Sequence, residues 1–479
     1  MSSRIQPEID KSSRVPIYKQ VKQYISQYIA LNPSLDMIPS EIELSRRFGI
    51  SRSTVRVAIL ELVNEGGLER IPGKGTFVVP TKKKLVFTNW LSAEAYSSAA
   101  LEFLLGEFMA DKRGVQIDNV GIPYLQTEHQ LMLMTSAGKA PDIAALIYLW
   151  IPIFAHQGAL QPLDNLYTPE FRNFFYPQTL KAVTFRDRFY SINWVNAPNI
   201  LYFNRRILAD YCGDADCRAE HYDSLIDLLV KIHEKSKGSV SPFSIPLMDD
   251  ELFFLYSIYH FLHSFEGGVL NNDGEVIFNS GQNIKAFTWL RNLIRKGHVD
   301  VSRGHLDNRS LFANNRVAFI IEGPWLLGII PTLNAQYRGD MSNIGFSTLP
   351  KGPTGVSWSV LWNHTLSIFK QCRNYDLALE FIKYLTLDPK VSATYYQMTR
   401  MLPVRRDELD NNPIYDDDFG RVLKKQMETA FPIPCADFPL FMVAITFCAK
   451  AAREILLGDA NIVSTLNAYS DLLKELYKR

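Results

Sequence analysis

The chain has 479 residues, of which 47% are hydrophobic, 21% charged and 12% aromatic, a composition typical of globular proteins. At about 100–200 residues per domain, this length predicts about three compact units. The longest uncharged apolar run, Ile143 to Ala155, is well short of the ~20 residues that a membrane-spanning helix needs, so no membrane partner is expected.

Charge is distributed unevenly along the chain. The net charge is +1, but residues 1 to 84 contain 14 Lys and Arg against 8 Asp and Glu, a net of +6, which leaves −5 for the remainder. A basic segment attracts nucleic-acid phosphates, whereas an acidic one is repelled by them. The first twenty residues mix charged and polar side chains and lack an apolar core, so no export signal is predicted and a cytoplasmic location is expected.

The first residues predict three helices. Residues 16 to 30, PIYKQVKQYISQYIA, place apolar side chains at helical spacing. A second, short helix is predicted to open at Ser40, which has capping-box spacing to Glu43, and to stop at Gly49. A third helix is predicted after Ser51, a favourable N-cap residue. Helix, tight turn and helix therefore follow one another, the order of a helix-turn-helix motif.

The third predicted helix exposes polar residues on its first turns, namely Arg52, Ser53, Thr54 and Arg56. In a helix-turn-helix, these N-terminal positions of the second motif helix reach base edges in the major groove, where Arg pairs with guanine. The segments LERI and TFVV then predict two short strands around residues 72 to 75, with Lys74 at the tip of the hairpin. The hairpin is interpreted as a wing, and Lys74 as a contact to phosphate or the minor groove.

Residues 16 to 80 resemble the GntR family of winged-helix DNA-binding domains, through PIYKQV, IPSE, SRSTVR, EGG and GKGTFV. The resemblance implies major-groove and phosphate contacts from Arg52, Thr54 and Arg56, and backbone contacts from Ser40 and Gly73. It also implies a homodimer on near-palindromic operator DNA. Two residues depart from the family pattern: Ile42 stands where many members carry a charged residue, and Gly67 replaces an apolar one.

The pattern changes after the head, which is assigned to residues 1–80 and followed by a linker at 81–84. From Leu85 to the C-terminus, 85–479, strand-like segments such as KLVFTNW, GVQIDNVGI and APDIAALI alternate with helical ones. Alternation of this kind predicts an α/β body with a mostly parallel sheet.

No catalytic, metal or cofactor site is predicted in this body. The nine histidines are scattered, and the spacing of His260 and His263 is more typical of packing than of a metal site. No nucleophile elbow, Walker loop or dinucleotide fingerprint follows a predicted strand. Two alternatives stay open: a head fused to a pyridoxal-phosphate-dependent, aminotransferase-like enzyme, and a solute-binding module without a DNA role.

The body is instead rich in tryptophans at predicted strand ends and in loops, namely Trp90, Trp150, Trp194, Trp325, Trp358 and Trp362. Strand ends in open α/β sheets are where ligands bind. Flat aromatic faces beside polar groups such as Glu322 and Asn363 suit ligands with an apolar face and a hydroxylated rim, above all sugars.

The segments AGKAPDIAALIYLWIPIFAHQGALQPLDNL, FYSINWVNAPNILYFNRRIL, LFANNRVAFIIEGPWLLG and IGFSTLPKGPTG resemble the family 1 extracellular solute-binding proteins, the group of maltose-binding protein. The resemblance implies a two-lobed, periplasmic-binding-protein-like (type II) α/β fold, with lobe one at about 85–195 and 351–396 and lobe two at about 198–350 and 402–479. The sugar-stacking tryptophan of the family falls on Trp325 of EGPW, and the cleft regions include Trp90, Tyr148, Trp150 and Trp194. Trp362 and Glu322 complete the expected ligand site.

The combined interpretation is a ligand-responsive transcription regulator without enzyme activity. We expect it to bind operator DNA as a dimer and to sense a small solute, a sugar or oligosaccharide, between the lobes. Lobe closure is expected to change the placement of the two heads and to release DNA.

Overall fold

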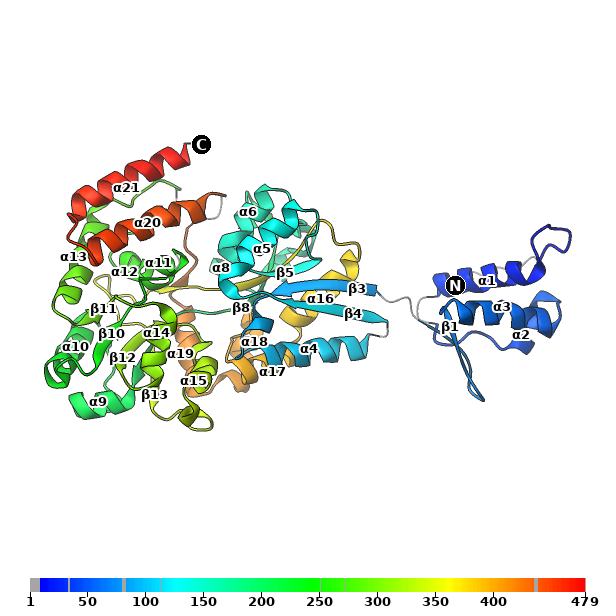
Figure 1. The fold of residues 1–479 in the computed structure, drawn as a ribbon, viewed down its shortest axis with the longest axis horizontal. Coiled ribbons are helices and arrows are strands. Elements are labelled where there is room, and N and C mark those ends of the chain that lie inside the picture. Colours follow the sequence, from blue (N-terminus) through cyan, green and yellow to red (C-terminus); the bar gives the residue numbers. More distant parts are fainter. Residues whose placement is uncertain are drawn as a thin grey trace. The chain divides into compact units, whose positions relative to one another are not determined.

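The computed structural model of the chain describes residues 9–32, 35–79, 83–112, 114–249, 251–271, 273–434 and 438–478 (Figure 1). The chain divides into two compact units. The first is Met1–Lys84 with the short segment Met109–Gln116, and the second is Leu85–Phe108 with Ile117–Arg479. The head, residues 1–80, belongs to the first unit, and the residues from Leu85 onward are called the body.

The head is a winged helix-turn-helix. Helices α1 (Ile17–Leu31), α2 (Glu41–Phe48) and α3 (Arg52–Asn64) precede the antiparallel strands β1 (Leu68–Ile71) and β2 (Gly75–Val78). One core holds these elements together and consists of the buried residues Val21, Ile25, Ile38, Leu44, Phe48, Val55, Ala58, Ile59, Leu62 and Leu68. Gly49 ends α2 in the left-handed conformation, with φ of 62°, which permits the tight turn into α3.

The first lobe of the body is built on a five-stranded sheet of order β4-β3-β5-β15-β8. Its strands are β3 (Lys83–Asn89), β4 (Val115–Gly121), β5 (Ile143–Ile147), β8 (Ile192–Val195) and β15 (His364–Ile368). Strands β3 and β5 are parallel, while β15 runs antiparallel to β5 and β8. Every residue of β5 is buried, as expected for a central strand covered on both faces. The helices around this sheet include α4 (Ser98–Asp111), α5 (Tyr124–Ser136), α6 (Ile151–His156) and α16 (Tyr375–Leu387).

The second lobe has its own five-stranded sheet of order β11-β10-β12-β9-β13. The strands are β9 (Ile200–Asn204), β10 (Ser241–Ser244), β11 (Val299–Asp300), β12 (Val317–Glu322) and β13 (Ile344–Ser347). Helices of this lobe include α10 (Tyr222–Ser236), α11 (Leu252–Ser257), α13 (Gly281–Arg295), α14 (His305–Ala313), α15 (Leu326–Leu333) and α19 (Asp418–Met427). Phe419 and Leu423 of α19 share one buried core with Tyr202 of β9, so part of the C-terminal region packs on this sheet.

Buried asparagines join the segments that cross between the lobes. Asn363 lies directly before β15 and donates to the side-chain oxygens of Asn196, at 3.1 Å, and Asn193, at 3.3 Å. Its own side-chain oxygen accepts from the backbone N–H of Ala197 at 3.2 Å. Asn196 donates in turn to the carbonyl of Pro403 at 2.9 Å. These amides satisfy backbone groups at the crossings that water does not reach.

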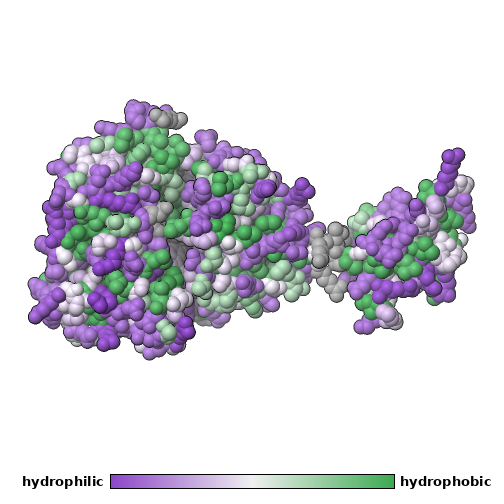
Figure 2. Space-filling model, viewed as in Figure 1, coloured by the Kyte–Doolittle hydropathy of each residue, from purple (hydrophilic) through white to green (hydrophobic). Residues whose placement is uncertain are grey.

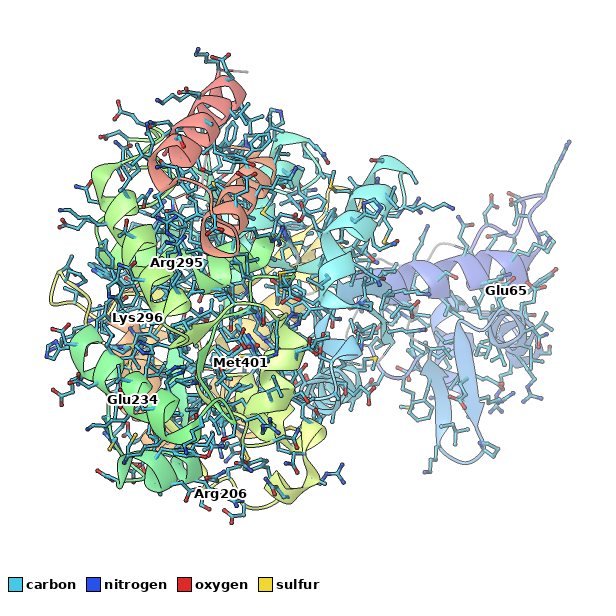
Figure 3. All side chains as sticks on the ribbon, turned by 60° about the vertical axis from the view of Figure 1, so that its left-hand side comes forward. Glu65, Arg206, Glu234, Arg295, Lys296 and Met401 are labelled. Atoms are coloured by element: carbon cyan, nitrogen blue, oxygen red, sulfur yellow. The ribbon has the colours of Figure 1, made fainter. Side chains whose placement is uncertain are left out.

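The surface is mixed in polarity. Hydrophilic side chains cover much of the visible face of both units, with hydrophobic areas between them (Figure 2). Charged side chains such as Arg206, Glu234 and Arg295 are exposed on lobe-two helices, whereas Met401 is buried (Figure 3). Among the residues that the structure describes, no helix has both the length and the apolar character required to cross a bilayer.

Candidate functional site

The exposed start of α3 is the most prominent polar surface of the head. Ser51 caps the helix by accepting the N–H of Thr54 at 3.2 Å, and its hydroxyl lies 2.7 Å from that of Thr54. Arg52 and Ser53 are exposed on the first turn, while Val55 is fully buried. Because Val55 fixes the rotation of α3, the side chains of Arg52 and Ser53 face solvent, as the sequence predicts for a helix that reads DNA.

Arg56 is held in place by a second helix. Its guanidinium donates twice to the Glu41 carboxylate of α2, at 3.2 Å and 3.0 Å to one oxygen, and Arg70 of β1 donates to the other oxygen at 2.6 Å. Hydrogen bonding from Arg56 is the main cause that holds the pKa of Glu41 below its usual value. One carboxylate thus connects α2, α3 and the wing. No motif in the sequence predicts this role for Glu41.

Replacing Glu41 by Gln is expected to lower the free energy of unfolding of the head by about 1–2 kcal/mol, because charge-assisted hydrogen bonds to two arginines are lost. Hydrogen exchange of α2 and α3 in the full chain at pH 7 measures the effect. Since folding lowers the pKa of Glu41, its contribution is present above the unfolded pKa of about 4.3 and is lost as pH falls through the lower folded value. Unchanged exchange rates in the variant would contradict the connecting role. The Glu69→Gln variant, at an exposed position of β1, is the charge-matched control.

The remaining predicted DNA contacts lie at two other places in the head. Ser40 caps α2 by accepting the N–H of Glu43 at 3.2 Å. Gly73, with φ of 75°, and Gly75, with φ of 129°, flank the exposed Lys74 at the tip of the wing. These positive φ angles are accessible to glycine at little cost, so the turn can be this narrow. Ile42 is 42% exposed on α2.

Between the two lobes of the body lies a pocket of about 310 Å³, which we call the interlobe pocket. Trp90 follows β3, Tyr124 begins α5, and Trp362 and His364 come from the entry to β15, all on the lobe-one side. The lobe-two side contributes Leu252 and Tyr256 of α11, His305 and Arg309 of α14, and Trp325 between β12 and α15. Both lobes therefore supply walls of the same pocket.

Aromatic rings form most of these walls. The Trp325 ring stacks on His364 with 6.0 Å between centroids and 15° between planes. Trp90 meets the edge of His364 at 4.9 Å, and Tyr256 meets Trp362 at 5.4 Å. Burial lowers the pKa of His364 to about 3, so its imidazole is neutral. Flat apolar faces with few charges favour ligands that have a flat apolar side.

Glu322 holds together the lobe-two wall by accepting hydrogen bonds from three of its side chains. Arg309 donates to its two carboxylate oxygens at 2.7 Å and 3.0 Å, Tyr256 donates at 2.5 Å, and the Trp325 indole donates at 3.0 Å. Burial opposes ionisation of Glu322, but the charge of Arg309 and these hydrogen bonds outweigh it and lower the pKa of Glu322. Glu322 therefore positions Trp325, and its oxygens are already occupied by protein donors.

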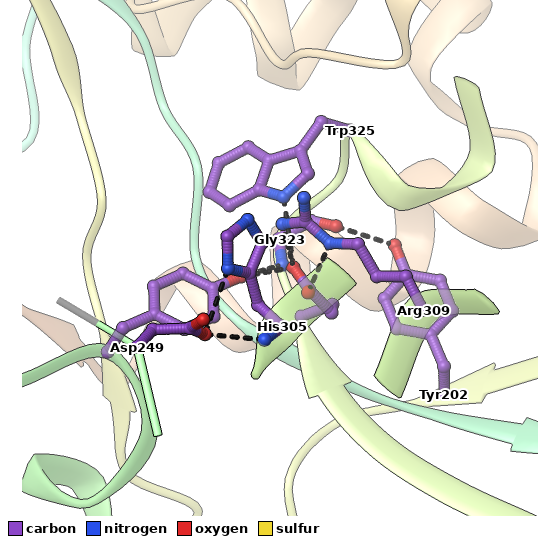
Figure 4. Close-up of polar contacts among 8 residues, drawn as sticks. Tyr202, Asp249, His305, Arg309, Gly323 and Trp325 are labelled. Atoms are coloured by element: carbon purple, nitrogen blue, oxygen red, sulfur yellow. Dashed lines mark hydrogen bonds and ion pairs between the residues drawn. The ribbon is translucent and has the colours of Figure 1, made fainter. Parts of the chain in front are cut away.

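The glycine of the EGPW sequence, Gly323, is required by the position of the Trp325 side chain. A Cβ atom on this residue would lie 2.3 Å from the Cη2 atom of Trp325, so only glycine lets the indole lie against the backbone. The carbonyl of Gly323 accepts from Tyr202 at 3.0 Å, and its N–H donates to the Tyr256 hydroxyl at 2.8 Å (Figure 4).

Substituting Gly323 by alanine is expected to displace Trp325 and to destabilise the body by about 1–3 kcal/mol, the usual cost of overpacking. Tryptophan emission and near-ultraviolet circular dichroism report the displaced indole, and urea unfolding reports the stability. Gly106→Ala in α4 is the matched control, because a Cβ there meets no atom within 4 Å. An unchanged tryptophan spectrum in Gly323→Ala would refute the predicted clash.

The predicted ligand residues are only partly brought together. Trp90, Trp325 and Trp362 line the interlobe pocket. Trp150 lies beside it, with its ring 5.9 Å from that of Trp90, and Glu322 lies behind Trp325. Two further predicted residues, Trp194 and Tyr148, do not line the interlobe pocket.

Trp194 stacks on Tyr395 at 5.4 Å in the interior of lobe one and is not among the residues that line either described cavity. Tyr148 lines a second, larger cavity of about 1330 Å³, and its hydroxyl accepts the N–H of Ile433 at 2.9 Å. Glu94, Tyr256, His305 and Arg309 were not predicted from the sequence. The spacing of His305 and Arg309, four residues apart on one helix, was the available signal for that pair.

Two family models match the chain. Residues 104–419 match the bacterial extracellular solute-binding proteins, and residues 17–78 match the gntR family of bacterial regulatory proteins. The maltotriose-binding protein of Pyrococcus abyssi is 20% identical over 401 residues, which cover 81% of this chain and 82% of that protein. The transcriptional repressor NagR of Bacillus subtilis is 47% identical over 77 residues, 15% of this chain and 31% of the repressor.

Solved structures of solute-binding proteins share the fold of the body. The solute-binding protein of an ABC transporter from Thermotoga lettingae, bound with alpha-D-tagatose, gives a TM-score of 0.72 at 20% identity and covers 82% of this chain and 99% of that one. Maltose-bound MalE3 of T. maritima gives a TM-score of 0.70 at 20% identity, with coverage of 82% and 99%. At this identity the likeness establishes the two-lobed fold.

Proposed function

Because the chain belongs to the bacterial extracellular solute-binding protein family and carries a GntR-type winged-helix head, we propose that it is a sugar-responsive transcription regulator. In this proposal the head binds operator DNA as part of a homodimer in the cytoplasm, and the interlobe pocket binds the effector. The observation that carries it is the combination, in one chain, of an exposed polar α3 and an aromatic pocket with walls from two lobes.

The properties of the pocket support a small carbohydrate as effector. Its volume of about 310 Å³ lies at the lower end of the range typical of small-molecule sites. Trp90, Trp325 and Trp362 offer flat faces to the apolar side of a sugar ring. Tagatose and maltose are the ligands of the two structural relatives, which supports the same class of ligand here. Because both lobes form the walls, a bound ligand favours the closed arrangement over the open one.

In the head, Arg52, Ser53, Thr54 and Arg56 are proposed to contact the major groove and phosphates, and Ser40, Gly73 and Lys74 to contact the backbone or minor groove. Lobe closure is proposed to change the spacing of the two heads and to release DNA. Coupling of this kind typically amounts to about 1–3 kcal/mol, or about 5–150-fold in affinity.

The test has two stages. A thermal-shift screen of the full chain against mono- and oligosaccharides identifies a stabilising sugar, and fluorescence anisotropy then measures affinity for DNA selected from a random library, with and without that sugar. We expect the sugar to weaken DNA binding by about 5–150-fold. Trp325→Ala should abolish the effect, whereas Trp358→Ala, in the other cavity, should preserve it. A sugar that stabilises the protein without changing DNA affinity would contradict the regulatory role.

A further inference from the structure

We propose that the effector of the interlobe pocket carries a protonated amine beside its hydroxyl groups, as an amino sugar does. This inference rests on the proposed function and names the chemical class of ligand for that site. It follows from the charges that surround the pocket, from the surroundings of Glu94 and from the aromatic walls.

Arg309 and His305, the basic side chains of the pocket lining, already have carboxylate partners. Arg309 is 13% exposed and directs its Nε and Nη2 atoms at Glu322, at 2.7 Å and 3.0 Å. The Nδ1 atom of His305 lies 2.9 Å from the carboxylate of Asp249 (Figure 4). The guanidinium of Arg309 is thus balanced by Glu322, and the imidazole of His305 already has a carboxylate as its hydrogen-bonding partner.

Glu94 is the acidic group of the lining that has no such partner. It follows the short 3-10 helix η1 (Leu91–Ala93), and its backbone carbonyl accepts the N–H groups of Ser97 and Ser98 at 3.1 Å and 3.0 Å. Its carboxylate, in contrast, accepts no hydrogen bond from the residues that the structure describes. Burial raises the pKa of Glu94, against smaller opposing effects of Arg309 and His305. Partial burial weakens the hydration of this carboxylate, and a bound cation offsets that loss.

The aromatic walls favour the same kind of ligand. The faces of Trp90, Trp325 and Trp362 carry the negative part of the ring quadrupole and attract cations, an effect that strengthens when water is excluded. His364 is neutral and does not repel a positive charge. A cation in this pocket therefore meets one free carboxylate and several electron-rich faces.

One buried polar atom of the pocket lining has no partner in the protein. The Nδ1 atom of His364 has no hydrogen-bond partner within the described parts of the chain, and His364 is only 3% exposed. A neutral imidazole nitrogen accepts or donates according to its tautomer, so a hydroxyl group of the ligand satisfies it. This points to a polyol that carries the amine. An acidic or phosphorylated sugar would instead be repelled by Glu94.

Matched pairs of sugars test the inference. Isothermal titration of the full chain at pH 6.5 compares glucosamine, galactosamine and mannosamine, each with its neutral parent and its N-acetyl derivative. For the pair whose stereochemistry fits, the amine is expected to bind at least about tenfold more tightly, which corresponds to about 1.4 kcal/mol. Glu94→Gln should remove this preference and leave the affinity for the neutral parent within about threefold. Glu102→Gln, an equal charge change at an exposed position of α4, should leave the preference intact.

The outcomes separate this inference from the proposed function. Tighter binding of the neutral parent or the N-acetyl derivative than of the amine would overturn the inference and leave sugar sensing in place. A preference for the amine that survives in Glu94→Gln would overturn the role of Glu94. If no sugar of any kind binds, both the inference and the proposed sugar sensor fail.

Discussion

Replacing Glu322 by alanine is expected to destabilise the body by about 3–5 kcal/mol, the range seen when one partner of a buried ion pair is removed. Arg309 would keep its charge inside the wall without a carboxylate, and the Tyr256 hydroxyl and the Trp325 indole would lose their acceptor. Urea unfolding of the full chain, followed by tryptophan emission, measures the loss as a lower midpoint.

The unpaired charge of Arg309 is expected to cause most of this loss of stability, and a double variant tests this. Glu322→Ala combined with Arg309→Met should recover part of the lost stability, because no unpaired charge stays buried. Asp459→Ala, which breaks the exposed pair with Arg295, should change stability by less than about 1 kcal/mol. A Glu322→Ala protein as stable as the parent would show that the buried pair is not needed for stability.

The contribution of Glu322 to the free energy of unfolding should also depend on pH. Its pKa is lowered in the folded chain, so the unfolded state binds the proton more readily. The stabilisation is therefore fully present above the unfolded pKa of about 4.3 and is lost as pH falls through the lower folded value. The difference in unfolding free energy between the parent and Glu322→Gln should shrink in acid, and a difference that is independent of pH would contradict this assignment.

Arg52→Ala is expected to weaken specific DNA binding by about 5–150-fold, equivalent to about 1–3 kcal/mol, because a bidentate contact from arginine to guanine carries that much discrimination. Arg52 is exposed at the start of α3, so the substitution leaves the head core unchanged. Affinity is measured by anisotropy on the selected operator and on variants of it.

Lys74→Ala provides the comparison within the head. A phosphate contact carries no sequence information, so this variant should weaken binding to all sequences similarly and reduce the salt slope by about 1. Arg295→Ala, an exposed arginine of the body, should leave both quantities unchanged. If Arg52→Ala weakened binding to every sequence equally, Arg52 would be a backbone contact and not a base contact.

The head could be predicted closely because its signals are local. Ser40 and Ser51 cap the helices that they were predicted to cap. Strand β1 coincides with LERI, and β2 begins and ends one residue before TFVV. Caps, turn glycines and apolar spacing act within one or two turns of the chain, so residue order alone is sufficient to recognise them. The connecting role of Glu41 was not predicted, because its partners Arg56 and Arg70 come from other elements.

The two-lobed fold of the body was also predictable, whereas the roles of individual tryptophans were not. Both Trp194 and Trp325 were predicted at strand ends. Trp194 lies within β8 and stacks on Tyr395 inside lobe one, whereas Trp325 follows β12 and lines the interlobe pocket. A strand-end position indicates the edge of a sheet but not which neighbouring element covers it.

Short-range patterns are sufficient to predict the head, its recognition helix, the α/β body and the tryptophan of EGPW. The charge of the pocket depends instead on contacts between distant segments, which exist only in the folded chain. The sequence does not reveal that Arg309 is paired with Glu322 or that Glu94 lines the interlobe pocket. Residues from Trp90 to His364 meet in this pocket only through folding, because they come from segments far apart in the sequence.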